Sequence, residues 1–339
     1  MANTVPSADS SREKNDTSSG FRKYNIPLEQ VAKFSHDDPR VDEYISEMKP
    51  VLITGSNMVE SAMKWDLDYI SEHMPNSNLT VIISKDHNFK YVNEKKIPQD
   101  QTSNLESIYT RRSSMTAREF IQRIKSWKEG DERLYLQQVL DSSFGPQLVQ
   151  DFLHFNWEWA KNKQRIHGWG PLTFNLLLIS MEGNVTPCHY DEQQNLFVGI
   201  RGIKRCILFP PEQFDCLYPP PVSDPHDRQS QVDFDNPDLK RFPKFREAHG
   251  MEAIVGRGDI LYIPLHWWHH IESKQNDDYT VSLNFWYKTK PTADIEYPLK
   301  GHQKVAILRN IEKMVAEALQ NPDEVSHLMR ALVLGRYTE

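Results

Sequence analysis

The sequence predicts a mainly β protein: a jelly roll of two facing sheets, with a mixed α/β region before it and a helical hairpin after it. From about residue 170, many short apolar runs alternate with Gly and Pro turns, as in sandwiches and jelly rolls. Two candidate metal ligands, His189 and His269, lie far apart in the chain, and a double-sheet arrangement would bring them together. After residue 299 the apolar spacing becomes helical.

Composition narrows the possible functions. The chain has 339 residues, 38% of them hydrophobic, which is ordinary for a globular protein. Its net charge of −7 leaves no basic excess for a phosphate backbone, so we expect no nucleic-acid partner. No run approaches the ~18 consecutive apolar residues of a membrane span, so we expect no membrane association. Three cysteines without a CxxC pair favour a reducing compartment.

We divide the chain into four regions. Residues 1–23 are rich in Ser, Asp and Asn, and we expect them to be disordered, without a signal peptide. Residues 24–130 form the mixed α/β region packed on the barrel. Residues 131–298 form the barrel with the candidate site, and residues 299–339 form the helical segment.

Strands are expected at residues 50–54, 80–84 and 89–92, where apolar and β-branched residues lie between polar turns. A capping box at 116–119 begins a helix with an apolar stripe. Residues 134–138 alternate like a strand.

Further along, residues 152–159 are either a helix or a buried aromatic segment, and periodicity leaves both possibilities open. Residues 172–181 are largely apolar at both odd and even positions, which predicts a strand buried on both faces. Two strands, 195–201 and 204–209, are joined at Gly202, which indicates a hairpin.

A long polar, Pro-rich insertion follows at 210–250, and connections of this length are usually functional or disordered. Strands are expected at 252–255, 259–263 and 279–287. At the C-terminal end, two apolar helices are separated by an Asn-Pro cap, and Gly335 ends the second. Their apolar stripe needs cover, either from the barrel or from a second copy of the chain.

The candidate metal ligands are His189, Asp191 and His269. Alone, a His-x-Asp sequence is a weak signal, since most such pairs are simply hydrogen-bonded surface groups. Side chains at i and i+2 of a strand end point to the same face, so one strand can offer both of the first two ligands. Two imidazoles and one carboxylate on one face of a metal leave positions open, as in non-heme Fe(II) oxygenases.

Open positions on ferrous iron favour a chelating co-substrate plus dioxygen, which points to 2-oxoglutarate. Lys204 is the candidate cation for its far carboxylate, although an isolated lysine at a strand start is usually solvated. Tyr135 and Thr186 can donate hydroxyls. Asn195 and Asn284 lie on predicted barrel strands, where an inward polar group must be paired or functional.

Five long motifs carry a resemblance to a known family: 186–197, 205–211, 227–237, 267–273 and 284–287. Through them the chain resembles the JmjC, cupin-type 2-oxoglutarate oxygenases, whose fold is a double-stranded β-helix. Within that family it resembles the asparaginyl hydroxylases that act on hypoxia-inducible factor α.

The resemblance implies that His189, Asp191 and His269 bind Fe(2+) and that His270 is not a ligand. It also implies that 2-oxoglutarate is held by Tyr135, Thr186, Asn195, Lys204 and Asn284. O2 is then the second co-substrate, and ascorbate a supporting reductant. The residues implied to contact the target side chain are Tyr91, Arg228, Gln229 and Trp286.

The implied reaction is β-hydroxylation of asparagine in oxygen sensing, with release of succinate and CO2. Expected partners are the C-terminal activation segment of hypoxia-inducible factor α, ankyrin-repeat proteins and a second copy bound through the C-terminal helices. The expected location is cytoplasm and nucleus. Two alternatives remain: a JmjC histone lysine demethylase, and a non-catalytic scaffold that binds ankyrin proteins.

Overall fold

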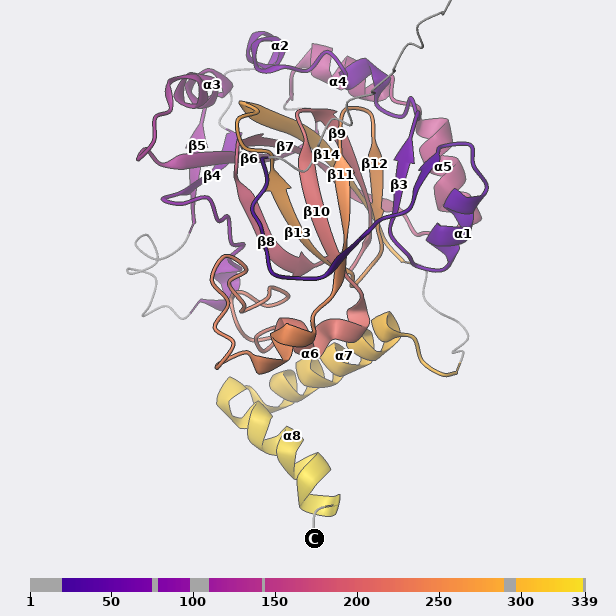
Figure 1. Cartoon of the computed structure of the whole chain (residues 1–339), viewed down its shortest axis with the longest axis vertical. Helices are drawn as coiled ribbons and strands as arrows, with labels where there is room; N and C mark the ends of the chain where they lie inside the picture. The colour runs from indigo at the N-terminus through magenta and orange to yellow at the C-terminus, as the bar shows by residue number, and fades with distance from the viewer. Residues whose placement is uncertain (1–19, 75–78, 98–109, 142–143, 290–296, 338–339) are drawn as a thin grey trace, which may run out of the picture.

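Two β-sheets face each other around a barrel interior, as the sequence predicts (Figure 1). The computed structural model describes residues 20–74, 79–97, 110–141, 144–289 and 297–337. The smaller sheet has, in spatial order, β1 (Leu28–Gln30), β11 (Gly250–Val255), β10 (Lys204–Phe209), β13 (Trp268–Ser273) and β8 (Val185–Tyr190). The larger sheet has, in spatial order, β2 (Lys33–Ser35), β3 (Val51–Thr54), β12 (Ile260–Ile263), β9 (Gln194–Arg201), β14 (Tyr279–Tyr287), β7 (Leu172–Met181), β6 (Arg133–Val139), β4 (Leu79–Ser84) and β5 (Arg111–Met115).

Helices cover the outside of the larger sheet and the foot of the barrel (Figure 1). The helices are α1 (Arg40–Ser46), α2 (Leu67–His73), α3 (Ala117–Ser126), α4 (Pro146–Leu153), α5 (Trp157–Ile166), α6 (Phe214–Leu217), α7 (Gly301–Leu319) and α8 (Pro322–Tyr337). Short 3-10 turns occur at η1 (Glu60–Ala62), η2 (Glu94–Lys96), η5 (Pro211–Gln213) and η6 (Pro243–Glu247). The predicted capping box is present at the start of α3, between Thr116 and Glu119.

Alternate side chains of a strand enter different cores. On β7, Leu177 and Ile179 pack in the core beneath the helices, whereas Leu178 packs in the core between the sheets. A third core lies on the outer face of the smaller sheet and contains Phe234 from the 210–250 insertion. Because both faces of β7 are buried, its sequence is almost continuously apolar, as predicted.

The predicted hairpin of β9 and β10 is wrong. β9 pairs with β12 and β14 in the larger sheet, whereas β10 pairs with β11 and β13 in the smaller one. Gly202 lies at the corner between the sheets with φ +70°. A Cβ there would lie 2.7 Å from the carbonyl oxygen of Tyr279. A tight glycine corner has the same sequence signature in both arrangements, and only the long-range pairing distinguishes them.

Two further predictions need correction or completion. Residues 89–92 are not a strand: the segment passes the edge of β8 with a single bridge, between Asn88 and Val185. Its aromatic residues are explained by packing, since Phe89 contacts the Tyr135 ring. The aromatic segment 152–159 combines both predicted alternatives, because α4 ends at Leu153 and α5 begins at Trp157.

The C-terminal helical pair is present, and Figure 1 shows α8 turning away from the barrel. Asn321 caps α8 by accepting a hydrogen bond from the Asp323 amide, as expected for this cap. The helix continues to Tyr337, two residues beyond the predicted end at Gly335. The segment predicted to be disordered, 1–23, lies outside the described residues except for its last four. No described helix is long and apolar enough to span a membrane.

Candidate metal centre

The fold brings the three predicted metal ligands together inside the barrel. β8 and β13 are neighbours, and their register places His189 directly opposite His269. Asp191 lies just past the end of β8. The ligand atoms of all three side chains lie within 4.8 Å of one another. Two imidazoles and one carboxylate at this separation suit a divalent transition metal.

A β-bulge in β8 sets which side chains face inward. Between the pairs His269–His189 and Ile271–Thr186, β8 has one residue more than β13. The extra residue lets Thr186 and His189, three positions apart, both face the interior, which a regular strand would not allow. Pro187 lies within the bulge, where a missing backbone N–H is tolerated.

Each imidazole is oriented by a backbone carbonyl. The Nδ1 of His189 lies 2.9 Å from the carbonyl oxygen of Pro187, and that of His269 lies 3.0 Å from the carbonyl oxygen of Trp267. When Nδ1 carries the donated hydrogen, Nε2 is left as the metal-binding atom. The Asp191 carboxylate accepts a 2.9 Å hydrogen bond from the indole N–H of Trp286.

Electrostatics favour the protonation states that bind a metal. Burial, and then His269, lower the pKa of His189 well below its usual value, and burial likewise lowers that of His269. Burial alone would raise the pKa of Asp191, but the neighbouring histidines and Arg228 hold it below its usual range. Neutral imidazoles beside an ionised carboxylate are the forms required of metal ligands.

The residues predicted to hold 2-oxoglutarate line the same interior. Lys204 is 4% exposed, and its Nζ lies 5.2 Å from the centre of the Tyr135 ring. No carboxylate among the described residues lies within ion-pair distance of Lys204, and burial lowers its pKa to about 8. The side-chain oxygens of Asn195 and Asn284 are buried without partners in the described structure. An ammonium without a carboxylate partner fits a carboxylate-bearing ligand. The two amides can bind such a ligand only through their N–H groups, because their unsatisfied oxygens are acceptors.

The predicted target-binding residues lie beside the metal ligands. Gln229 bridges to His189, and the side-chain nitrogen of Gln229 donates to the carbonyl oxygen of Tyr91. Arg228 points its guanidinium towards Asp191, at 3.7 Å between nitrogen and carboxylate oxygen. Tyr91 itself is 44% exposed. The 210–250 insertion has a defined position where it meets the metal centre, so the disordered alternative is wrong there.

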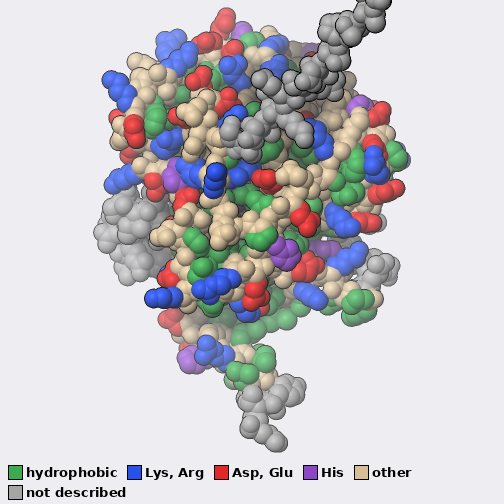
Figure 2. Space-filling model, in the orientation of Figure 1, with side chains coloured by type: hydrophobic (Ala, Val, Ile, Leu, Met, Phe, Trp, Pro, Cys, Tyr) green, Lys and Arg blue, Asp and Glu red, His purple; other side chains and the backbone are tan. Residues whose placement is uncertain are grey.

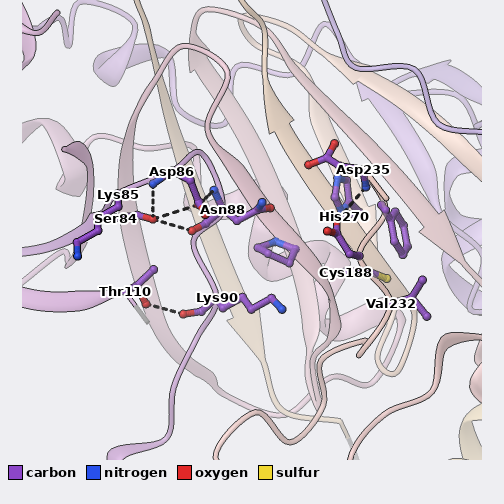
Figure 3. Close-up of a pocket in the computed structure, with 13 residues that line it drawn as sticks. Ser84, Lys85, Asp86, Asn88, Lys90, Thr110, Cys188, Val232, Asp235 and His270 are labelled. Carbon is purple, nitrogen blue, oxygen red and sulfur yellow. Dashed lines mark hydrogen bonds between the residues drawn. The ribbon is translucent and has the colours of Figure 1, made fainter. Parts of the chain in front are cut away.

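His270 faces the opposite side of β13 from His269. It stacks on Phe234 and lies 3.0 Å from the hydroxyl of Tyr24. Figure 3 shows His270 and Cys188 at one side of a cavity of about 490 Å³, with Lys90 across from them. None of the three metal ligands lines this cavity, so it is distinct from the metal centre.

Sequence reasoning missed a buried ionic network next to the centre. Arg309 of α7 contacts Asp227 and Glu192, which adjoin Arg228 and Asp191 in sequence. The sequence shows only that a predicted helix with an apolar stripe carries one arginine, and this does not identify the partners of that arginine.

Comparison with known proteins places the chain in a family. The cupin-like domain family matches residues 38–293. Human HSPB1-associated protein 1 is 36% identical over 162 residues, which cover 46% of this chain and 32% of that protein. Lysine-specific demethylase 8 from Danio rerio is 26% identical over 283 residues, or 78% of this chain and 62% of that protein.

The chain therefore spans about a third of the length of the HSPB1-associated protein it matches. The family match, in contrast, covers well over half of the chain and every described strand of the two sheets except β1 and β2. A JmjC-type cupin domain with this His-Asp-His triad implies dependence on Fe(II) and 2-oxoglutarate. The chain belongs to the cupin-like domain family, of the JmjC type.

Proposed function

We propose that this chain is an Fe(II)- and 2-oxoglutarate-dependent protein hydroxylase. The main support is the convergence of His189, Asp191 and His269 in a barrel that also buries the unpaired Lys204. When bound, iron and 2-oxoglutarate supply the oxidising chemistry with dioxygen, and 2-oxoglutarate leaves as succinate and CO2. The protein supplies binding, orientation and exclusion of water.

In this proposal each interior polar residue has a defined task. Lys204 pairs with the far carboxylate of 2-oxoglutarate, while Tyr135 and Thr186 donate hydroxyl hydrogen bonds to it. Asn195 and Asn284 offer side-chain amides to the carboxylate that chelates the metal. Burial raises the pKa of Tyr135 to about 12, so its hydroxyl keeps the proton that it donates.

For the target, we propose the β-carbon of asparagine. The main-chain bridge of Gln229 to His189 and the guanidinium of Arg228 place amide and cationic donors beside the metal ligands. A neutral carboxamide can accept from both without carrying charge into the barrel. The motif resemblance to factor inhibiting hypoxia-inducible factor supports the activation segment of hypoxia-inducible factor α and ankyrin-repeat proteins as substrates.

A second candidate is lysine demethylation, which is favoured by the names of the lysine-specific demethylase relatives. That reaction hydroxylates an N-methyl carbon and releases formaldehyde. It requires a cationic methylammonium to approach the metal. The positive charge of Arg228, 3.7 Å from Asp191, opposes that approach, so we rank this reaction second.

The test is to incubate the purified chain with Fe(II), 2-oxoglutarate and three substrates: an ankyrin repeat, an activation-segment peptide and a methyl-lysine histone peptide. We expect succinate formation coupled to one added oxygen on asparagine, measured by mass spectrometry. Loss of methyl groups from lysine would instead establish the demethylase. Ankyrin binding without any 2-oxoglutarate turnover would establish the scaffold and refute the hydroxylase.

A further inference from the structure

Arg309 is an unusual residue for the helix that carries it. It lies in the middle of α7 and is 3% exposed. Its Nη1 and Nη2 donate to the two carboxylate oxygens of Asp227 at 2.6 and 2.9 Å, and its Nε donates to Glu192 at 3.1 Å. The guanidinium also lies 5.5 Å from the Tyr190 ring. All three guanidinium nitrogens are therefore engaged.

Two partners of Arg309 flank the ligand Asp191 in the sequence. Glu192 directly follows the ligand Asp191, and Tyr190 directly precedes it. Asp191 lies beyond the last residue of β8, where its backbone carbonyl accepts one hydrogen bond, from the His266 amide at 2.8 Å. Arg309 contacts the residues on either side of Asp191, a placement from which it can limit where that carboxylate points.

A third partner, Asp227, directly precedes Arg228, whose guanidinium lies near Asp191. Arg228 has φ +70°, a conformation that residues other than glycine rarely adopt. Such a conformation persists only where the surrounding structure enforces it. The bidentate contact of Arg309 with Asp227 supplies such a constraint one residue away.

The network is ionised in the folded protein. Burial raises the pKa of Asp227, but hydrogen bonding to Arg309 and the charge of Lys96 outweigh this and leave it below its usual value. Burial alone would lower the pKa of Arg309, but its hydrogen bonds to Asp227 outweigh burial and raise the pKa above its usual value. A buried ion pair is weak evidence for stability, since apolar packing often serves equally well. Apolar packing would not, however, reproduce the directional, bidentate hydrogen bonds between Arg309 and Asp227.

We propose that Arg309 is a positioning residue of the metal centre, which fixes Asp191 through Glu192 and Tyr190 and fixes Arg228 through Asp227. The inference rests on the proposed function for the identity of the metal and co-substrate. It assigns to α7 a role beyond covering the foot of the barrel, because this helix orients one metal ligand.

Loss of Arg309 would leave α7 attached by other contacts. Glu312 accepts a hydrogen bond from the Val222 amide at 2.8 Å, and the carbonyl oxygen of His302 lies 3.1 Å from Nδ1 of His266. We therefore expect Arg309→Met to fold, with its thioether packed against Tyr190. Lys313→Ala is the matched control, because it removes a charge from the same helix and the same partner, Glu192, at an exposed position.

The experiment measures Mn(II) binding to the full chain by anaerobic titration, with thermal unfolding measured in parallel. We expect Arg309→Met to weaken Mn(II) binding about 10-fold, at the lower end of what is usual for residues that orient metal ligands. Arg309→Lys, which keeps the charge without the bidentate fork, should fall between Met and wild type. Lys313→Ala should bind as wild type does.

A double variant, Arg309→Met with Asp227→Asn, separates positioning from stability. It removes both buried charges, so we expect the melting temperature to recover while Mn(II) binding stays weak. Recovery of both properties would overturn the inference, and so would wild-type affinity in Arg309→Met. Failure of the wild-type chain itself to bind Mn(II) would instead refute the proposed function, and the inference with it.

Discussion

At the scale of single residues, the two metal-binding imidazoles are oriented in the same way. Each Nδ1 lies within hydrogen-bond distance of the carbonyl oxygen two residues earlier in the chain, Pro187 for His189 and Trp267 for His269. Both Nε2 atoms can therefore face the metal. The ligand identities could be predicted from the motif, because chemistry restricts them to a few residue types. The indole hydrogen bond from Trp286 to Asp191 could not, since an aromatic in a strand is equally compatible with plain core packing.

Asp191 is the only anionic ligand of the three. Asp191→Ala should abolish Mn(II) binding and 2-oxoglutarate turnover, because two neutral imidazoles alone hold a divalent ion weakly. Calorimetry and succinate release check the two effects. Asp235→Ala, which removes a carboxylate paired with His87 outside the centre, should bind metal normally. Full turnover by Asp191→Ala would refute the metal assignment.

The second prediction concerns Lys204. Lys204→Ala should raise the KM for 2-oxoglutarate about 100-fold or more, because a buried charge left unpaired costs about 3–5 kcal/mol. The pKa of Lys204 is lowered to about 8, so its positive charge is present below that pH and lost above it. In wild type, 2-oxoglutarate binding should therefore weaken as the pH rises through about 8.

Lys204→Arg keeps its charge over this range and should flatten the pH dependence. The measurement is the KM for 2-oxoglutarate between pH 6.5 and 9.5 in a buffer series of constant ionic strength, a range chosen to bracket ~8. An unchanged KM in Lys204→Ala would exclude this residue as the counter-ion.

At the scale of elements, most strands could be predicted from their apolar runs and turn residues, but not the sheet to which each belongs. β9 and β10 show why: the sequence around Gly202 predicts a hairpin turn, yet the residue forms a corner between two sheets. The bulge in β8 could not be predicted from the sequence either, because it is defined only by the register with β13. Both the sheet to which a strand belongs and the position of a bulge depend on long-range strand pairing, which a local sequence pattern does not determine.

Gly202 offers a test of this corner. Gly202→Ala should lower the free energy of unfolding by about 1–3 kcal/mol, because its φ is positive and the new Cβ would contact the Tyr279 carbonyl oxygen. Gly130→Ala is the control: its φ is also positive, but nothing lies within 4 Å of the added Cβ. Urea unfolding compares the two. Equal losses would show that the corner is not sterically constrained.

The C-terminal helices leave an apolar surface uncovered. Figure 2 shows acidic and basic side chains interspersed over the visible face, with hydrophobic side chains near its foot, where Figure 1 places α7. Exposed apolar residues on the two helices are Ile307, Leu308, Ile311, Met314, Leu328, Leu332, Val333 and Leu334. We propose that a second copy covers this surface.

Leu332→Glu should then convert the dimer to a monomer, because a charge in an apolar interface is left unpaired. Light scattering measures the mass directly. Ser326→Glu adds the same charge to the same helix at a polar position and should leave the dimer intact. A dimer that persists in Leu332→Glu would place the contact elsewhere.

At the scale of the whole molecule, pairing of distant strands within the smaller sheet makes the metal triad, and the larger sheet closes over it with Asn195, Asn284 and Trp286. His189 and Asp191 come from one strand end, and His269 comes from the adjacent strand some 80 positions later. The double-sheet fold was predictable from the many short strands between Gly and Pro turns, whereas the separation of the two histidines required only that distant strands pair. The contribution of α7 was not, since the contact of Arg309 with Asp227 joins parts of the chain that share no sequence pattern.

The measurement that most directly tests this account is a crystal structure of the chain grown anaerobically with Mn(II) and 2-oxoglutarate. We predict one metal ion coordinated by His189 Nε2, Asp191 and His269 Nε2, with the far carboxylate of 2-oxoglutarate on Lys204. A metal ion bound elsewhere, or a barrel that holds 2-oxoglutarate away from Lys204, would contradict the account.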